Sequence, residues 1–327
     1  MSADQLAGLS DNLILGTVLL YLAAMIGFAM DLAFGKARAN APAKANAPAK
    51  ANAPVKANAS VEAEATVAAG GAGGVAVLEA DTSPEPPAWA AKAGTTGFVL
   101  GWIGGVANLV AIICHGLAVE RWPWGNMYEF VLSLCFAAVA AFLGLGLRNN
   151  IRYLGAFVMV AATLGIGFAV KFLYVQAGPV VPALDSYWIA IHVSAAIIAS
   201  GMFTVAAVSG VLYLIRGDGL SRLPARADLE RVAHRAIVLA FPIWTFAVIA
   251  GSLWADKAWG RYWGWDPKEV WAFITWIAYA AYLHAKATAG WRGRSIATVQ
   301  LVAYGCLLFN LVGVNMFLGG LHSYSGL

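Results

Sequence analysis

Charged side chains are scarce in this sequence, and their scarcity excludes a water-soluble globular protein. Asp, Glu, Lys and Arg make up 12% of the 327 residues, whereas hydrophobic residues make up 61%. Such a chain lacks the polar surface that a compact globule needs in water, so the lipid bilayer is its expected solvent. An α-helix of about 20 apolar residues satisfies its own backbone hydrogen bonds in lipid. The sequence therefore predicts an all-α, polytopic integral membrane helical bundle.

Cysteine is also scarce, and its spacing excludes two kinds of redox site. The three cysteines, Cys114, Cys135 and Cys306, all lie in apolar stretches, and none forms Cys-x-x-Cys. The chain therefore has neither a thiol–disulfide exchange motif nor the Cys-x-x-Cys-His haem attachment site of a c-type cytochrome. We interpret the three cysteines as small buried hydrophobic residues.

Eight apolar stretches are long enough to cross a bilayer, so we expect about eight transmembrane helices. Lys and Arg gather in the connections that follow the first, third, fifth and seventh stretches. Because cytoplasmic loops are rich in Lys and Arg, these connections are predicted inside and both termini outside. The positive charges that give the net charge of +4 thus indicate how the chain is oriented in the membrane, and we expect no nucleic-acid partner. The stretches cover residues 12–34, 97–118, 130–147, 154–175, 187–215, 236–253, 272–290 and 296–318.

Composition divides the chain into three parts. Residues 1–11 lack the basic start and small-residue cleavage site of a cleaved signal peptide, so residues 1–34 are predicted to stay as a transmembrane anchor. Residues 35–94 contain Lys-Ala-Asn-Ala-Pro-Ala hexads and then turn Gly-rich, a composition that buries no core. We expect a flexible cytoplasmic linker there, with attraction of its lysines to anionic lipid as the weaker alternative. Residues 95–327 are the predicted functional core.

The tryptophan loop, residues 254–271, is the densest aromatic segment of the core. It holds five of the thirteen tryptophans, separated in part by glycines. An aromatic belt at the membrane surface is the simplest explanation for any one of them. The density of the group favours a platform for a planar apolar ligand. The five residues are Trp254, Trp259, Trp263, Trp265 and Trp271.

The second half of this loop predicts the start of a helix. Asp266 is a preferred N-cap residue, Pro267 suits the first helical position, and Glu269 stands at the capping-box position. The N–H groups at a helix start attract anions. Haem is a planar ring with two carboxylates at one edge, so the platform and the helix start match its two ends. The alternative is that Asp266 and Glu269 only cap the helix.

Residues 259–271 read Trp-Gly-x-x-Trp-Gly-Trp-Asp-Pro-Lys-Glu-x-Trp, which resembles the WWD signature of the CcsA/ResC family of System II cytochrome c biogenesis. The signature is similar also to that of the CcmC and CcmF proteins. A chain of this length with one such loop resembles the CcsA branch. The resemblance covers roughly residues 97–327, including Asn126-Met-Tyr-Glu129, Ser186-Tyr-Trp-Ile-Ala-Ile-His192 and Gly320-Leu-His-Ser-Tyr324.

The resemblance implies a function in handling haem. A CcsA-like protein is expected to bind haem b without a covalent bond, move it to the outer face, and present it for attachment to apocytochrome c. It would be the haem-handling subunit of a holocytochrome c synthase. The alternative is a haem transporter or a CcmC-like delivery protein without synthase activity, which the sequence does not separate from a synthase. A quinol-oxidising b-type cytochrome is disfavoured, because its paired histidines would lie within the spans.

His192 and His322 form the predicted outer site. His192 is near the outer end of its span, and His322 follows the last span, so both face the side of the tryptophan loop. Two neutral imidazoles suit the axial positions of haem iron. The resemblance implies that these two residues flank the outer haem.

His284 lies about twelve residues into the 272–290 stretch, hence roughly 18 Å from the outer surface. Polar groups at such depth are often functional. The resemblance implies that His284 ligates a second, inner haem, whose other ligand comes from a CcsB/ResB-type membrane partner. Of the other histidines, His115 matches no family histidine, and His234 is expected on a solvated inner loop.

The resemblance also implies partners and a location. The partners are the CcsB/ResB-type protein, an apocytochrome c with a Cys-x-x-Cys-His motif and, indirectly, thiol-reducing proteins. The expected location is the plasma membrane, with the haem site on the extracytoplasmic face.

Overall fold

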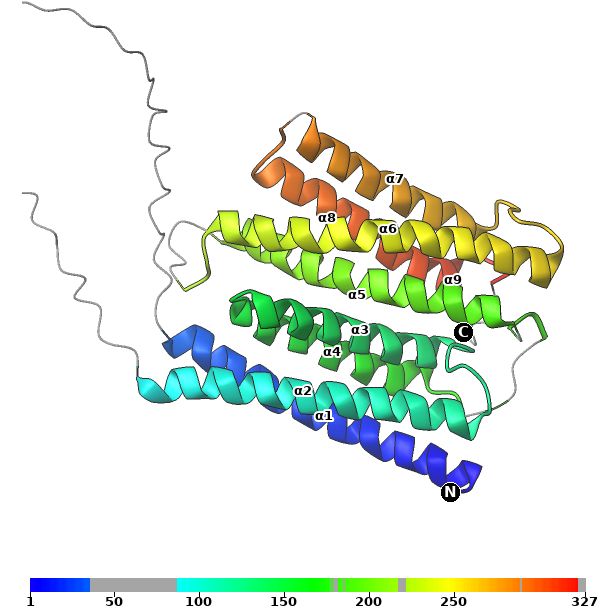
Figure 1. Ribbon diagram of the computed structural model, residues 1–327, viewed down its shortest axis with the longest axis horizontal. Helices are drawn as coiled ribbons and strands as arrows, with labels where there is room; N and C mark the ends of the chain where they lie inside the picture. Colours follow the sequence, from blue (N-terminus) through cyan, green and yellow to red (C-terminus); the bar gives the residue numbers. More distant parts are fainter. Residues whose placement is uncertain are drawn as a thin grey trace, which may run out of the picture. The chain divides into compact units, whose positions relative to one another are not determined.

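The computed structural model describes residues 1–35, 87–176, 178, 182–184, 186–216, 222–288 and 290–322. These residues form helices that run alongside one another, and none of them forms a strand (Figure 1). The predicted all-α membrane bundle is confirmed. The α-helices are α1 (Ala3–Phe34), α2 (Ala88–Ala118), α3 (Met127–Arg148), α4 (Gly155–Phe168), α5 (Tyr187–Ile215), α6 (Arg226–Trp259), α7 (Pro267–Ala287), α8 (Arg294–Leu308) and α9 (Val314–Phe317). The 3-10 segments are η1 (Arg152–Leu154) and η3 (Pro182–Leu184), and the π segments are η2 (Ala169–Leu173) and η4 (Phe309–Gly313).

Among the described residues, seven helical segments are long and apolar enough to cross a membrane, one fewer than the sequence predicted. The predicted stretch that is absent from these seven is the seventh, 272–290, which corresponds to α7, a helix of 21 residues that packs against α6 and α8. Its first turn carries Lys268 and Glu269 and its last turn His284 and Lys286, so polar residues shorten its apolar part. The chain is a multi-pass membrane protein, and α7, although 21 residues long, is not among the helices apolar enough to cross a membrane.

Helix α1 belongs to the same compact unit as the rest of the bundle. The α1 and α2 backbones approach closely, because a Cβ atom on Gly27 would lie only 2.7 Å from Ala93 O. Ser10 Oγ donates to Ala111 O at 2.9 Å, and the rings of Phe28 and Phe142 meet edge to face at 5.6 Å. Small residues thus let α1 pack directly on the rest of the bundle.

The structure differs from the predicted segment boundaries in two places. Helix α2 begins at Ala88, so it already covers residues 88–94 of the predicted 35–94 linker, while residues 36–86 lie outside the described residues. Helix α6 extends at both ends beyond the predicted 236–253 stretch. Apolarity marks the part of a helix that lies in lipid, and a helix continues past that part where polar residues can face water.

Helices α5, α6, α7 and α8 share one buried cluster that positions the candidate site. Phe203 of α5 stacks on Tyr279 of α7 with ring centroids 3.7 Å apart, and Trp244 of α6 meets Phe203 edge to face. This packing holds the C-terminal end of α6 beside the N-terminal end of α7. The start of α1 lies at the same end of the bundle (Figure 1).

Candidate functional site

The tryptophan loop is mostly helical. Trp254 and Trp259 lie on the last turns of α6, and Trp271 lies on α7. Gly260 ends α6 in the left-handed conformation, with φ of 70°, as glycine does at many helix ends. The irregular connection is therefore only residues 260–266, shorter than the predicted 254–271 loop. The residues from Ala255 to Ala258 favour helix, and the sequence prediction gave more weight to the tryptophan pattern than to this propensity.

The predicted helix start at Asp266 is confirmed. Asp266 Oδ2 accepts a hydrogen bond from Lys268 N at 3.1 Å, and Pro267 occupies the first helical position. Glu269 Oε2 accepts from Asp266 N at 3.1 Å and from Gly264 N at 2.8 Å. This reciprocal capping box fixes the connection 260–266 against α7.

Asp266 also binds the C-terminal segment. Its Oδ2 accepts from His322 Nδ1 at 2.7 Å, and its Oδ1 accepts from Leu321 N at 2.6 Å. Burial alone would raise the pKa of Asp266, but the hydrogen bonds from His322, Leu321 and Lys268 outweigh burial and lower it. A charged Asp266 accepts from His322 Nδ1, so this bond selects the imidazole tautomer with its lone pair on Nε2.

The imidazole ring of His192, on α5, is also oriented by a hydrogen bond at Nδ1. Its Nδ1 lies 2.7 Å from Ala247 O, which can only accept, so Nδ1 carries the proton and Nε2 the lone pair. A Cβ atom on Gly251 would lie 2.7 Å from this ring, so only glycine admits His192 against α6. Both imidazoles therefore present the ring nitrogen that suits a metal ion.

Trp254 contacts both histidine rings. Its ring is parallel to that of His192 within 6°, with centroids 6.2 Å apart, and its centroid lies 5.7 Å from that of His322. Trp259 meets Trp254 at 4.7 Å and His322 at 5.0 Å. The structure thus gathers four predicted residues, which lie far apart in the sequence, into one aromatic cluster.

A cavity of about 160 Å³ opens beside this cluster. Its wall includes both histidines, Trp254, Trp259 and Trp263, so five predicted residues line it. Asp266 is not in the wall and acts through His322. The wall also contains residues that the sequence did not single out as ligand contacts: Trp124, Asn126, Tyr262, Lys268, Asn310 and Asn315.

For two of these residues, the sequence contains a feature that could have identified them. Asn310 and Asn315 are polar residues within an apolar stretch, which often marks function. They meet at the cavity because Phe309–Gly313 forms a π segment, and π turns recur at functional sites. Two buried polar atoms in the wall, Trp124 Nε1 and Asn310 Oδ1, have no hydrogen-bond partner among the described residues. The wall can therefore accept a ligand with polar groups.

Trp265, Trp271 and His284 do not line this cavity. Trp265 is 69% exposed, with a left-handed φ of 56° that turns its ring outward. Trp271 packs on Phe309, with centroids 4.3 Å apart. His284 is exposed in the last turn of α7, about 25 Å from Pro267 by helical rise. The estimated depth of 18 Å was too small because α7 begins five residues before the predicted stretch.

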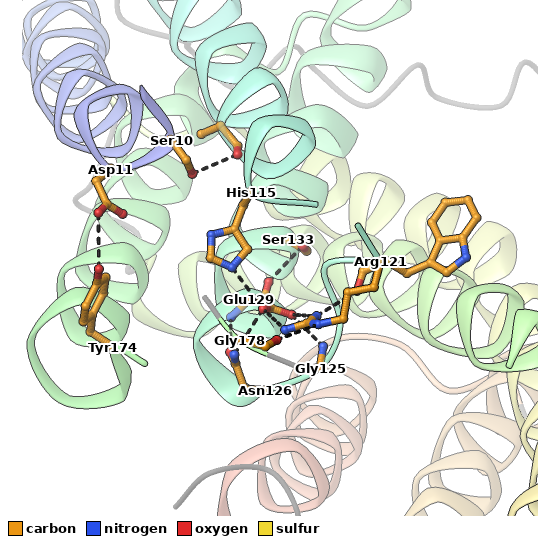
Figure 2. Close-up of polar contacts among 12 residues, drawn as sticks. Ser10, Asp11, His115, Arg121, Gly125, Asn126, Glu129, Ser133, Tyr174 and Gly178 are labelled. Atoms are coloured by element: carbon orange, nitrogen blue, oxygen red, sulfur yellow. Dashed lines mark hydrogen bonds and ion pairs between the residues drawn. The ribbon is translucent and has the colours of Figure 1, made fainter. Parts of the chain in front are cut away.

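His115 belongs to a separate polar cluster, shown in Figure 2. Glu129, only 2% exposed, lies at its centre and contacts His115 Nε2 at 3.0 Å. Arg121 donates to both carboxylate oxygens, at 2.8 and 2.9 Å, and Gly125 N and Asn126 Nδ2 donate as well. This cluster fixes the turn between α2 and α3, which carries Trp124 and Asn126 to the cavity. His115 thus has a structural partner that the sequence did not predict.

His234 lies on α6, which begins at Arg226, so the prediction of a solvated loop position was wrong. Its ring is half-buried, and its Nδ1 lies 3.4 Å from the Tyr282 hydroxyl of α7.

Glu129→Ala is expected to lower the free energy of unfolding by about 3–5 kcal/mol, because it leaves the Arg121 guanidinium partly buried without its counter-charge. Thermal and denaturant unfolding in detergent measure this change. The matched control is Asp228→Ala, which removes an exposed ion pair with Arg231 and should cost less than about 1 kcal/mol. Equal losses for the two variants would contradict the structural role of the cluster.

This chain is similar in sequence to proteins of cytochrome c assembly. The family described as Cytochrome C assembly protein matches residues 124–322. The cytochrome c biogenesis protein CcsA of Chlamydomonas reinhardtii is 34% identical over 237 residues, which cover 67% of this chain and 66% of that protein. CcsA of Gloeobacter violaceus is 30% identical over 293 residues, covering 69% and 87%, and CcsA of Synechococcus elongatus is 32% identical over 282 residues, covering 68% and 87%.

Among solved structures, the cytochrome c haem lyase CcmF has a similar fold, with a TM-score of 0.53 and 15% sequence identity. The similarity covers 95% of this chain and 47% of that chain. This chain thus spans about half the length of CcmF, and the likeness concerns the fold alone.

Proposed function

Since the chain belongs to the cytochrome c assembly family and takes part in cytochrome c biogenesis, we propose that it binds haem b non-covalently in the cavity beside α5, α6 and α7 and presents it to apocytochrome c. Haem is the cargo, and its vinyl groups are attached to the two thiols of the apocytochrome. The chain's own residues hold and orient the ring. The main support for this proposal is that two imidazole rings, each held by a hydrogen bond at Nδ1, line the same aromatic cavity.

Each part of the wall has a role in this proposal. His192 and His322 ligate the iron through Nε2, and Ala247 O and Asp266 orient the two rings. Trp254, Trp259 and Trp263 supply apolar ring surface and limit access of water. Holding the ring in one orientation converts the encounter with apocytochrome into an oriented reaction, which contributes several kcal/mol to such a step.

The cavity must open before it holds a porphyrin. Its volume of about 160 Å³ is below the roughly 300–1,000 Å³ of pockets for drug-sized ligands. The segment 320–322 closes one side through its bonds to Asp266. Loading therefore requires this segment or the connection 260–266 to move.

We further propose that this chain works with a membrane partner and faces the extracytoplasmic side. His284 lies at the opposite end of α7 from the cavity, exposed on the helix surface, where a CcsB/ResB-type partner can supply the second ligand of an inner haem. The cavity faces the extracytoplasmic side of the plasma membrane, where apocytochrome c with its Cys-x-x-Cys-His motif arrives. Thiol-reducing proteins act on the apocytochrome rather than on this chain.

The purified chain, alone or with its partner, is expected to carry non-covalent haem with a low-spin bis-imidazole absorption spectrum. Two nitrogen ligands on a porphyrin iron give such a spectrum. Absorption spectroscopy of protein from haem-replete membranes, with acid–acetone extraction, tests the proposal. A colourless, folded protein would count against it. Attachment to a co-expressed reporter apocytochrome separates synthase activity from delivery alone.

A further inference from the structure

Lys268 is a basic residue in the cavity wall. It lies in the first turn of α7, and its side chain lines the same cavity as His192 and His322. Burial lowers the pKa of Lys268 to about 7, although the nearby charge of Asp266 acts in the opposite direction. The ammonium group is therefore short of the solvation or counter-charge that normally stabilises it.

The protein partner of Lys268 is neutral. Nζ donates to Asn315 Oδ1 at 2.9 Å. Asn315 is held in this orientation, because its Nδ2 donates to Leu311 O at 2.8 Å and to Met127 Sδ at 3.0 Å. Lys268 has two further donor positions on the same ammonium group.

The neighbouring carboxylates are engaged elsewhere. Glu269 accepts from Gly264 N and Asp266 N, and Asp266 accepts from His322, Leu321 N and Lys268 N. Over the part of the chain that the structure describes, no carboxylate oxygen lies within 4.0 Å of Lys268 Nζ. The wall thus presents a lysine with no ion-pair partner among the described residues to the space beside the two histidines.

Other donors point to the same conclusion. The indole N–H of Trp124, in the wall of the same cavity, is buried without a partner among the described residues. The N-terminal end of α7, where the helix dipole is positive, lies beside Lys268. These features favour a ligand that is apolar over most of its surface and anionic at one edge.

We propose that Lys268 binds the carboxylate groups of the ligand, which on the proposed function are the haem propionates, and so sets the orientation of the ring in its own plane. A planar ring can rotate in its own plane, so an anchor at its one acidic edge is needed to direct its vinyl groups consistently. The competing explanation is structural, namely that Lys268 only ties α7 to α9 through Asn315.

The test compares two ligands that differ only in their acidic edge, iron protoporphyrin IX and its dimethyl ester. Each is titrated into the full-length chain in detergent, and binding is followed by absorption. The parental chain is expected to bind the acid about ten- to hundredfold more tightly than the diester, the range for a hydrogen bond to a charged group. Lys268→Met should bind the acid as weakly as the diester and leave diester affinity unchanged, whereas Lys268→Arg should keep the preference.

The control is Lys257→Met, which removes an exposed lysine from the end of α6 that does not line the cavity and should leave both affinities at the parental level. Equal affinity of the parental chain for the two ligands would overturn the inference without any variant. Equal weakening of both ligands by Lys268→Met would assign Lys268 the structural role instead. If the parental chain binds neither ligand, the proposed function itself fails, which is a distinguishable result.

Discussion

Replacing His192 or His322 by alanine is expected to reduce covalent haem attachment to a co-expressed apocytochrome c by more than about tenfold, since even residues behind a metal ligand often change metal affinity by about 10–100-fold. The two variants should behave alike, because both imidazoles line the same cavity and contact Trp254. Haem staining of the reporter cytochrome, normalised to the amount of variant protein, measures the loss.

Added imidazole should restore part of the activity. Truncation to alanine leaves the ring's acceptor in place, Ala247 O for His192 and Asp266 for His322, so a free imidazole can be held by the same hydrogen bond. His234→Ala is the control, because His234 is a half-buried helical histidine away from the cavity. Parental assembly rates in both His192→Ala and His322→Ala would show that these residues are not axial ligands.

His284→Ala is expected to lower haem at both the inner and the outer site, whereas Trp263→Ala should deplete only the outer site. His284 is at the end of α7 remote from the cavity. In the proposed orientation this end is cytoplasmic, so cargo that comes from the cytoplasm reaches it first. Trp263 lies in the cavity wall, and its loss removes ring surface from the outer site alone. Haem content per polypeptide, measured with the CcsB/ResB-type partner present, distinguishes the two patterns.

The structure supplies a matched control for this comparison. Trp265 is two residues from Trp263 but is exposed, so Trp265→Asn should leave outer haem nearly unchanged, and asparagine tolerates the left-handed backbone at this position. Full outer occupancy in His284→Ala would mean that haem reaches the cavity by another route. This chain would then be an outer receptor supplied by a different protein.

Local signals in the sequence predicted the elements that depend on local chemistry. The order Asp266, Pro267, Glu269 defines a capping box within four residues, and the structure has that box. The sequence also predicted that His192 and His322 lie close together, because the number of spans between them places both residues at the same end of the bundle. Neither prediction needed the partners of the residues to be known.

Contacts between distant residues were not predictable in the same way. Lys268 stands two residues after Asp266 in sequence, yet its bond to Asn315 depends on how α7 packs against α8 and on the π segment before α9. Glu129 is fourteen residues from His115, and only the folding back of the turn between α2 and α3 brings them together. Tryptophan spacing likewise did not reveal that Trp254 and Trp259 are helical, because an aromatic platform and an amphipathic helix end share the same pattern.

Two hydrogen bonds to Asp266, from Leu321 N and His322 Nδ1, tie the C-terminal segment to the start of α7. Bonds of this charged kind contribute about 1.5–3 kcal/mol each. If haem is the cargo and the cavity opens at residues 320–322, these bonds must break for the cargo to exchange, and local opening of this segment then sets the residence time. On the proposed function, such a carrier would release haem slowly by itself, and an arriving apocytochrome would accelerate release by replacing His322 as an iron ligand.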